Sequence, residues 1–177
     1  MKEGHLGPRD RKRLEHAFTL AVEWHAQQLR KGTSIPYLSH PVQGAGSVLE
    51  HGGEVEQAAA AFLHDALEDA PNAMERTRRE QRIQRDLGLA HAVLRIVLDC
   101  TDTEADESLG QKRPWREREE RYLKHLAPAS QASGLVAVCD KRNNLGTIVA
   151  EVRKHGVKYL KRFSATRDQQ VTGTSAE

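Results

Sequence analysis

The sequence has few of the residues on which disulfide frameworks, β-sheets and membrane spans depend. Its 177 residues include two cysteines, Cys100 and Cys139, which are far apart and form no C-x-x-C pattern, so we expect reduced thiols. Aromatic residues make up only 5% of the chain, which disfavours an all-β fold. No run of 18 apolar residues is present, so no transmembrane helix is expected. The polar start MKEGHLGPRDRKR predicts no secretory signal, and a cytoplasmic location follows as an expectation.

An excess of charge of one sign is also lacking. The 27 Lys and Arg residues nearly balance the 25 Asp and Glu residues, for a net charge of +2. A basic run over 76–85 (RTRREQRIQR) could suggest nucleic-acid binding, but no aromatic stacking platform accompanies it. A solvated helix face is the favoured interpretation. We therefore expect neither nucleic acid nor a membrane as a partner, and no pattern predicts the oligomeric state.

Helical periodicity dominates what the sequence does contain. Apolar residues recur at helical spacing and are interrupted by Gly, Pro or polar segments, which predicts a series of helices. A polar loop is expected over 101–114. The helices are expected at 10–31, 41–50, 54–69, 72–87, 89–99, 115–126 and 131–155. The length fits about one domain. We predict a single all-α domain over 1–163 and a polar, flexible tail over 164–177.

The predicted helix over 54–69 contains the most informative residues. It is apolar nearly all round, which is typical of a helix at the centre of a fold. Yet it bears His64, Asp65, Glu68 and Asp69, whose i, i+3 and i, i+4 spacing would place them on one stripe. Three carboxylates crowded on a central helix repel one another and lose solvation, and a cation would relieve that cost. An imidazole beside a carboxylate suits Mn, Fe or Zn.

Two residues elsewhere could complete a metal site. His40 lies between two prolines in PYLSHP, where a capping or packed histidine is the alternative interpretation. Asp140 follows the apolar VAV run and needs a partner, which a metal or Arg142 could provide. Asn144 follows Asp140 by four residues and so faces the same direction on a helix.

The order His40, His64–Asp65, Asp140 resembles the H…HD…D pattern of the HD superfamily of metal-dependent phosphohydrolases. More narrowly, WHAQQLRKGTSIPYLSHP, AAFLHDALEDA and VCDKRNNL resemble the hydrolase domain of RelA/SpoT-type enzymes and their small stand-alone relatives, over 13–155. Those enzymes remove the 3′-pyrophosphate from guanosine tetra- and pentaphosphate in the stringent response. The resemblance implies an all-α HD-domain helical bundle with a central metal-bearing helix, and from the length we expect no synthetase domain.

The resemblance also implies roles for nine residues. The metal, usually manganese with Fe or Zn as alternatives, would be bound by His40, His64, Asp65 and Asp140. The acidic pair that orients or deprotonates the attacking water would be Glu68 and Asp69. The nucleotide substrate would be contacted by Arg30, Lys31 and Asn144.

Several positions depart from the family pattern. The segment KGTSIPY is one residue longer than usual, and Arg142–Asn143 replaces the usual Leu–His pair. The charge of Arg142 could alter substrate choice or add to phosphate binding. Two alternatives therefore stay open: an HD phosphohydrolase of another nucleotide or phosphoester, and a catalytically weak HD domain that binds nucleotide.

Overall fold

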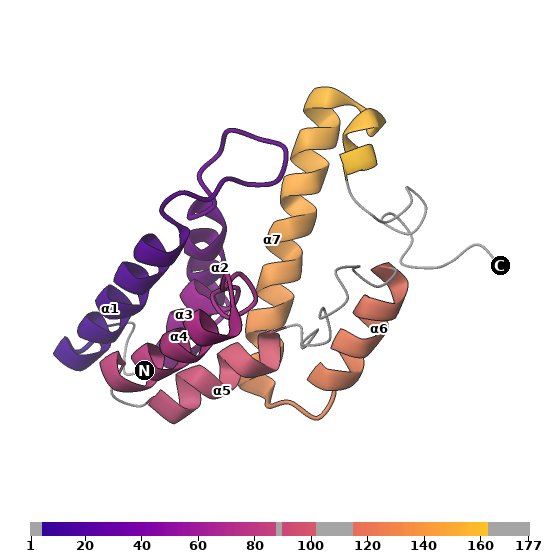
Figure 1. Ribbon diagram of the computed structural model, residues 1–177. Helices are drawn as coiled ribbons and strands as arrows, with labels where there is room; N and C mark the ends of the chain where they lie inside the picture. The colour runs from indigo at the N-terminus through magenta and orange to yellow at the C-terminus, as the bar shows by residue number, and fades with distance from the viewer. Residues whose placement is uncertain (1–4, 88–89, 102–114, 163–177) are drawn as a thin grey trace.

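The computed structural model describes residues 5–87, 90–101 and 115–162, and within these ranges the chain is helical (Figure 1). The elements in chain order are α1 (Pro8–His25), α2 (Ser39–Glu50), α3 (Val55–Leu63), α4 (Ala73–Asp86), α5 (Ala90–Cys100), α6 (Trp115–Leu126), α7 (Gln131–His155) and a 3-10 helix, η2 (Val157–Arg162). No strand forms within the described ranges, apart from one isolated bridge between Leu29 and Pro36. The predicted all-α fold is confirmed.

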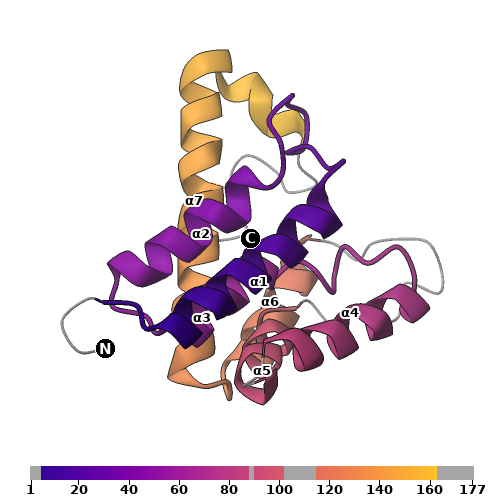
Figure 2. The same ribbon diagram turned by 90° about the vertical axis from the view of Figure 1, so that its left-hand side faces the viewer.

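Helix α3 lies at the centre of the bundle. It packs against α1, α2, α5 and α7 (Figures 1 and 2). Its four consecutive alanines, Ala58–Ala61, are buried together with Leu63. Small side chains let neighbouring helices approach on every side, which explains why an all-round apolar helix occupies this position. The predicted central place of this segment is confirmed.

The regular helix α3 is shorter than the predicted 54–69. It ends at Leu63, and residues 64–69 form turns. His64 Nδ1 lies 2.9 Å from the carbonyl oxygen of Ala61, which a continued helix would pair with the N–H of Asp65. Pro71 further disfavours helix at Ala70. The prediction of one helical stripe bearing all four polar residues is therefore wrong, and a compact turn presents them instead.

Helix α4 supports this turn from outside. Arg79 is buried, and its Nη1 donates to the carbonyl oxygen of Ala66 at 2.7 Å. Its guanidinium also lies 5.2 Å from the centre of the Trp24 ring on α1. A carbonyl that lost its helical partner at the end of α3 is thus satisfied by a charged donor.

Helix α1 also ends earlier than predicted, at His25 rather than at residue 31. The following loop pairs with itself: Arg30 N donates to Ile35 O, and Tyr37 N donates to Gln28 O, both at 2.8 Å. Gly32 adopts a positive φ of 72° within this loop, a conformation that glycine accepts without strain. The loop leads directly into α2, where Pro41 is accommodated in the first turn.

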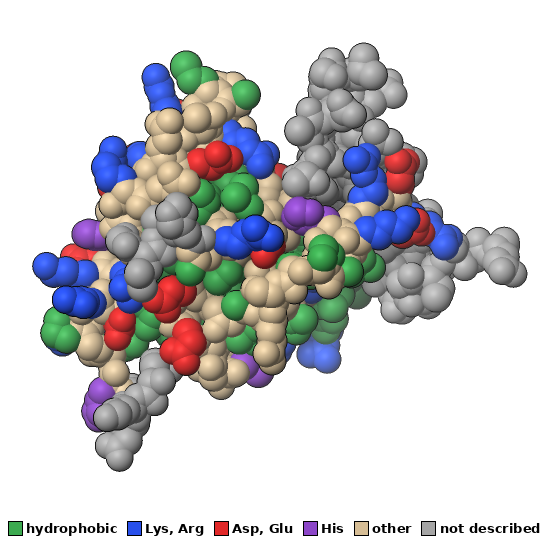
Figure 3. Space-filling view, turned by 90° about the horizontal axis from the view of Figure 1, so that it is seen from below, with side chains coloured by type: hydrophobic (Ala, Val, Ile, Leu, Met, Phe, Trp, Pro, Cys, Tyr) green, Lys and Arg blue, Asp and Glu red, His purple; other side chains and the backbone are tan. Residues whose placement is uncertain are grey.

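The remaining helices agree closely with the predicted ranges. Helices α6 and α7 have the predicted bounds, and α4 and α5 differ from prediction by one residue at each end. The predicted loop over 101–114, from residue 102 on, and the predicted tail over 164–177 lie outside the described residues. None of the described helices is long and apolar enough to cross a bilayer. On the face seen in Figure 3, acidic and basic side chains are interspersed without a large area of one sign.

Candidate active site

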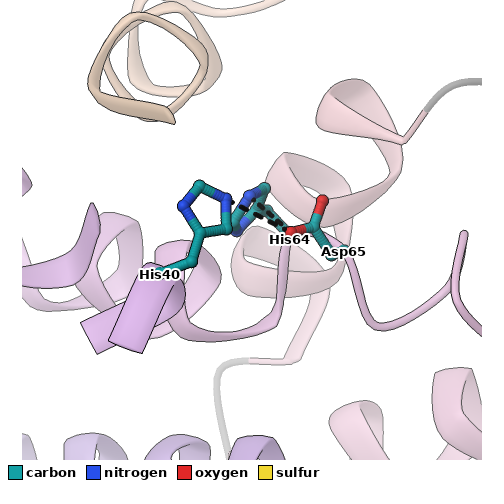
Figure 4. A group of neighbouring side chains, drawn as sticks. All are labelled: His40, His64 and Asp65. Carbon is teal, nitrogen blue, oxygen red and sulfur yellow. Dashed lines mark ion pairs between the residues drawn. The ribbon is translucent and has the colours of Figure 1, made fainter. Parts of the chain in front are cut away.

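Three separate elements bring two histidines and two aspartates together. His40 lies at the start of α2, His64 and Asp65 follow the end of α3, and Asp140 lies on α7. The His64 Nε2 atom is 3.0 Å from Asp65 Oδ2 and 3.4 Å from Asp140 Oδ1. The His40 Nε2 atom is 3.0 Å from Asp140 Oδ1 and 3.4 Å from Asp65 Oδ2. Figure 4 shows both rings directed at the Asp65 carboxylate.

Hydrogen bonds on the far side of each ring determine which nitrogen faces the cluster as an electron-pair donor. His64 Nδ1 lies against the Ala61 carbonyl, which only accepts, so that nitrogen carries a proton. His40 Nδ1 lies 2.6 Å from Asn143 Oδ1, also an acceptor. In the neutral rings both Nε2 atoms therefore present lone pairs to two carboxylates. Although Asp65 is near, the buried His64 Nε2 has no partner in hydrogen-bond geometry among the described residues.

This donor set fits a divalent metal ion. Two imidazole nitrogens and two carboxylate oxygens, all electron-rich and within a few ångströms, repel one another unless protons or a cation lie between them. The mixture of nitrogen and oxygen donors is typical of sites for Mn, Fe or Zn. The outer hydrogen bonds to Ala61 and Asn143 are the kind that orient metal-binding histidines.

Without a metal, protons have to stabilise the same cluster. Burial alone would lower the pKa of His64, but the Asp65 and Asp140 carboxylates together outweigh it and hold that pKa well above its ordinary value. The pKa of His40 is raised in the same way, with burial outweighed by Asp140 and Asp65. Conversely, burial is outweighed at both aspartates, and their pKa values are lowered by the histidines. Metal binding must therefore release protons.

The metal-free protein should accordingly lose stability as the pH rises above about 6.5. Raised histidine pKa values stabilise the fold fully below the ordinary value of 6.5, and this contribution disappears as the pH rises through the raised values. The lowered aspartate pKa values contribute above 3.8, so they do not reverse the trend. Thermal midpoints of chelator-treated protein across this range measure the effect. A saturating divalent metal should abolish the decline, whereas a midpoint that rises with pH in the chelated protein would contradict this account.

The acidic pair lies in the turn that follows the cluster. Glu68 and Asp69 are both exposed, and the Asp69 N–H donates to the Asp65 carbonyl at 2.9 Å. Gln28 Nε2 donates to Asp69 Oδ2 at 2.8 Å, while Gln28 Oε1 lies 2.6 Å from Nδ1 of the buried His25. A buried histidine thus fixes the orientation of the Gln28 amide, which holds the Asp69 carboxylate close to the cluster.

The basic residues singled out from the sequence lie in a pocket beside the cluster. This pocket has a volume of about 250 Å³ and is lined by Arg30, Lys31, Tyr37, Asn144, Thr147, Ile148 and Tyr159. The guanidinium of Arg30 donates to Asn144 Oδ1 at 3.1 Å, and Asn144 Nδ2 donates to Asp140 Oδ1 at 2.7 Å. The Tyr37 hydroxyl donates to Asp65 Oδ2 at 2.5 Å. Asn144 and Tyr37 therefore join the pocket directly to the cluster of histidines and aspartates.

Arg142 lies apart from these groups. Its Nη1 donates to Ser47 Oγ at 2.9 Å, and it lines a separate groove of about 720 Å³ between α2 and α7. Because Thr147 lines both this groove and the pocket of Arg30 and Lys31, the two adjoin, and the expectation that Arg142 helps to neutralise phosphate charge stays a prediction. Ser47, rather than Asp140, is the partner that the structure provides.

Three residues of the site were not assigned roles from the sequence. Tyr37, Gln28 and Asn143 contact Asp65, Asp69 and His40, respectively. Tyr37 and Gln28 belong to the irregular loop, where no periodic pattern indicates which side chains meet. Asn143 lies three positions after Asp140, an i, i+3 helical spacing that could have indicated its proximity to the cluster.

An all-helical bundle that gathers two histidines and two aspartates from three elements defines a class of metal-binding domain. The chain belongs to the HD domain family, whose profile matches residues 17–157. This is the superfamily that the sequence pattern resembled.

Comparison with curated proteins identifies more specific relatives within this superfamily. The chain is 35% identical over 136 residues to guanosine-3′,5′-bis(diphosphate) 3′-pyrophosphohydrolase MESH1 of Danio rerio, covering 75% of this chain and 67% of that protein. It is 46% identical over 59 residues to a probable enzyme of the same name from Synechocystis sp.. It is 38% identical over 68 residues to one from Aquifex aeolicus. These two matches cover only 8% and 10% of the longer proteins.

Proposed function

We propose that this protein is a metal-dependent phosphohydrolase that removes the 3′-pyrophosphate of guanosine tetra- and pentaphosphate, with manganese as the ion and the cytoplasm as its location. The observation that carries the proposal is the pairing of an imidazole–carboxylate cluster with a basic pocket bonded to it through Asn144 and Tyr37. The similarity to MESH1, which extends over three quarters of the chain, supports the substrate class.

Four residues would hold the metal: His40, His64, Asp65 and Asp140. When bound, a divalent ion acts as a Lewis acid toward a phosphoryl oxygen and increases the acidity of water. The chain itself contributes the orientation of the donors. Ala61 and Asn143 hold the two imidazoles, and Tyr37 and Asn144 each donate to one of the carboxylates.

Glu68 and Asp69 would take up the proton of the attacking water. Hydrolysis adds the water oxygen to phosphorus, breaks the bond from that phosphorus to the 3′ oxygen, and leaves a proton on the 3′ hydroxyl. Both carboxylates are exposed and so can exchange protons with solvent between turnovers. Gln28 holds the Asp69 carboxylate, and the Asp69 N–H donates to the Asp65 carbonyl, so Asp69 is fixed one turn from a proposed metal ligand.

The pocket beside the cluster would receive the nucleotide. Arg30 and Lys31 are the cations that line it, and they can neutralise phosphate charge close to the reacting group. Arg30 lies 5.8 Å from the Tyr37 ring centre and donates to Asn144, so its planar face is already held in place. A preordered guanidinium of this kind suits both stacking on a base and hydrogen bonding to phosphate.

The test is an assay of purified protein with guanosine tetraphosphate and Mn²⁺. The expected products are inorganic pyrophosphate and guanosine diphosphate, and a chelator should abolish their release. Folded protein that contains metal and releases no pyrophosphate would contradict the proposal. A panel of other nucleotides and phosphoesters distinguishes another HD phosphohydrolase, and tight nucleotide binding without turnover would identify a nucleotide-binding domain instead.

A further inference from the structure

A pair of amide side chains outside the proposed metal site contacts one of its two histidines on the ring nitrogen that faces away from the carboxylates. Asn143 Oδ1 lies 2.6 Å from His40 Nδ1, and Asn143 Nδ2 donates to Gln43 Oε1 at 2.5 Å. His40 is buried, whereas Gln43 is exposed on the same helix. The result is a chain of hydrogen bonds from the surface of α2, through α7, back to a proposed metal ligand.

The direction of this chain of hydrogen bonds favours one tautomer of His40, in competition with the Asp140 and Asp65 carboxylates that face Nε2. An amide has an acceptor at one end and donors at the other. With its oxygen toward His40, Asn143 requires a proton on Nδ1, and the neutral ring then offers a lone pair at Nε2. If both amides reversed, Asn143 would donate to Nδ1, the proton would move to Nε2, and His40 could no longer bind a cation there.

In the structure Gln43 Oε1 accepts from Asn143 Nδ2, which corresponds to the first of these two directions. We propose that Gln43 and Asn143 are positioning residues, which hold His40 in the Nδ1-protonated tautomer and so prepare Nε2 to bind the metal. The inference rests on the proposed metal site, but it goes beyond it by assigning a role to two residues outside the ligand set. Asn143 occupies the position of the histidine in the Leu–His pair that is usual in the family pattern.

Paired substitutions at Gln43 test the direction directly. Gln43→Glu can only accept from Asn143 and preserves the arrangement, whereas Gln43→Lys can only donate and favours its reversal. We expect Gln43→Lys to weaken Mn²⁺ binding about 10- to 100-fold, the usual cost of losing an outer partner of a metal-binding histidine. Gln43→Glu should not weaken it.

The effect of the charge that each Gln43 substitution introduces must be separated from its effect on the hydrogen-bond direction. Val42 is the exposed neighbour of Gln43 on α2, so Val42→Lys and Val42→Glu introduce the same charges without touching Asn143. The proposal requires both Val42 variants to bind Mn²⁺ like the unmodified protein. If Val42→Lys weakens binding as much as Gln43→Lys does, the effect is electrostatic and the proposal is overturned.

Asn143 provides the complementary comparison. Asn143→Leu removes the acceptor and should weaken Mn²⁺ binding about 10- to 100-fold, while Asn143→Asp keeps an acceptor and should restore it. Circular dichroism and thermal midpoints of the chelated proteins verify folding in each case. Equal binding by the Asn143→Leu and Asn143→Asp variants would overturn the proposal.

Nitrogen NMR measures the tautomer without any metal. In ¹⁵N-histidine-labelled, chelated protein at alkaline pH, where the ring is neutral, the His40 signals should report a proton on Nδ1. They can be assigned by their loss in a His40→Gln variant. A proton on Nε2 would overturn the proposal even if the protein binds metal, whereas failure of the unmodified protein to bind Mn²⁺ would refute the metal site alone.

Discussion

A His64→Ala variant is expected to purify without the divalent metal proposed for the unmodified protein, and to lose nearly all hydrolysis. His64 provides a buried nitrogen that lies between both carboxylates and has no hydrogen-bond partner among the described residues. A metal contributes several kcal/mol of transition-state stabilisation, so its loss corresponds to a decrease of roughly 10³-fold or more in rate. Elemental analysis and the pyrophosphate assay measure the two effects.

Two further variants make the result on His64 interpretable. Asp65→Asn retains the shape of the side chain and removes only its charge, so it should also lose metal while disturbing the fold less than the loss of a buried ring does. His51→Ala removes an exposed histidine at the other end of α2 and should retain metal and activity. Full metal content in both His64→Ala and Asp65→Asn would refute the central claim about the cluster.

Substitutions in the acidic pair should also decrease turnover, but here the protein should keep its metal. Glu68→Gln and Asp69→Asn eliminate the carboxylates that would accept the proton of the attacking water. General-base catalysis typically contributes about 10²- to 10⁴-fold, so we expect a decrease of that size in kcat. The metal content should match that of the unmodified protein, because neither carboxylate belongs to the cluster of proposed ligands.

The contacts of Asp69 make Asp69→Asn a substitution that changes charge alone. Asp69 is held by Gln28 and by the Asp65 carbonyl, so Asn at this position can keep both contacts and lose only the charge. Glu120→Gln, on the exposed face of α6, is a control for the loss of one surface carboxylate. If both acidic-pair variants turn over substrate at the unmodified rate, another group must accept the proton.

Periodicity predicted the helices well where apolar spacing was long and the breaks were strong. Helices α6 and α7 have their predicted bounds because Pro128 and Ser130 separate them and Gly156 ends α7. The end of α3 was mispredicted because it depends on a side-chain contact, that of His64 with the Ala61 carbonyl, and on Arg79 from a different helix. Neither is visible in a local pattern.

The proposed ligands show the same contrast between what the sequence pattern predicts and what depends on tertiary contacts. His40, His64, Asp65 and Asp140 meet as the motif order suggested, although spacing alone could not show that their nitrogens and oxygens lie within 3.0–3.4 Å. The direction of Arg142 was not predictable, because a long side chain on a helix can reach either of two neighbouring grooves. Its partner Ser47 belongs to α2, and only the packing of α2 on α7 brings them together.

The two imidazoles of the cluster are secured over very different distances along the chain. His64 is oriented by a carbonyl three residues away, in the helix that it directly follows, whereas His40 is oriented by an amide 103 residues away. During folding, the first contact can form as soon as α3 does, but the second must await the docking of α7. A nascent chain therefore carries half of the proposed site before α7 is synthesised, and the complete donor set exists only once α7 has docked on α2.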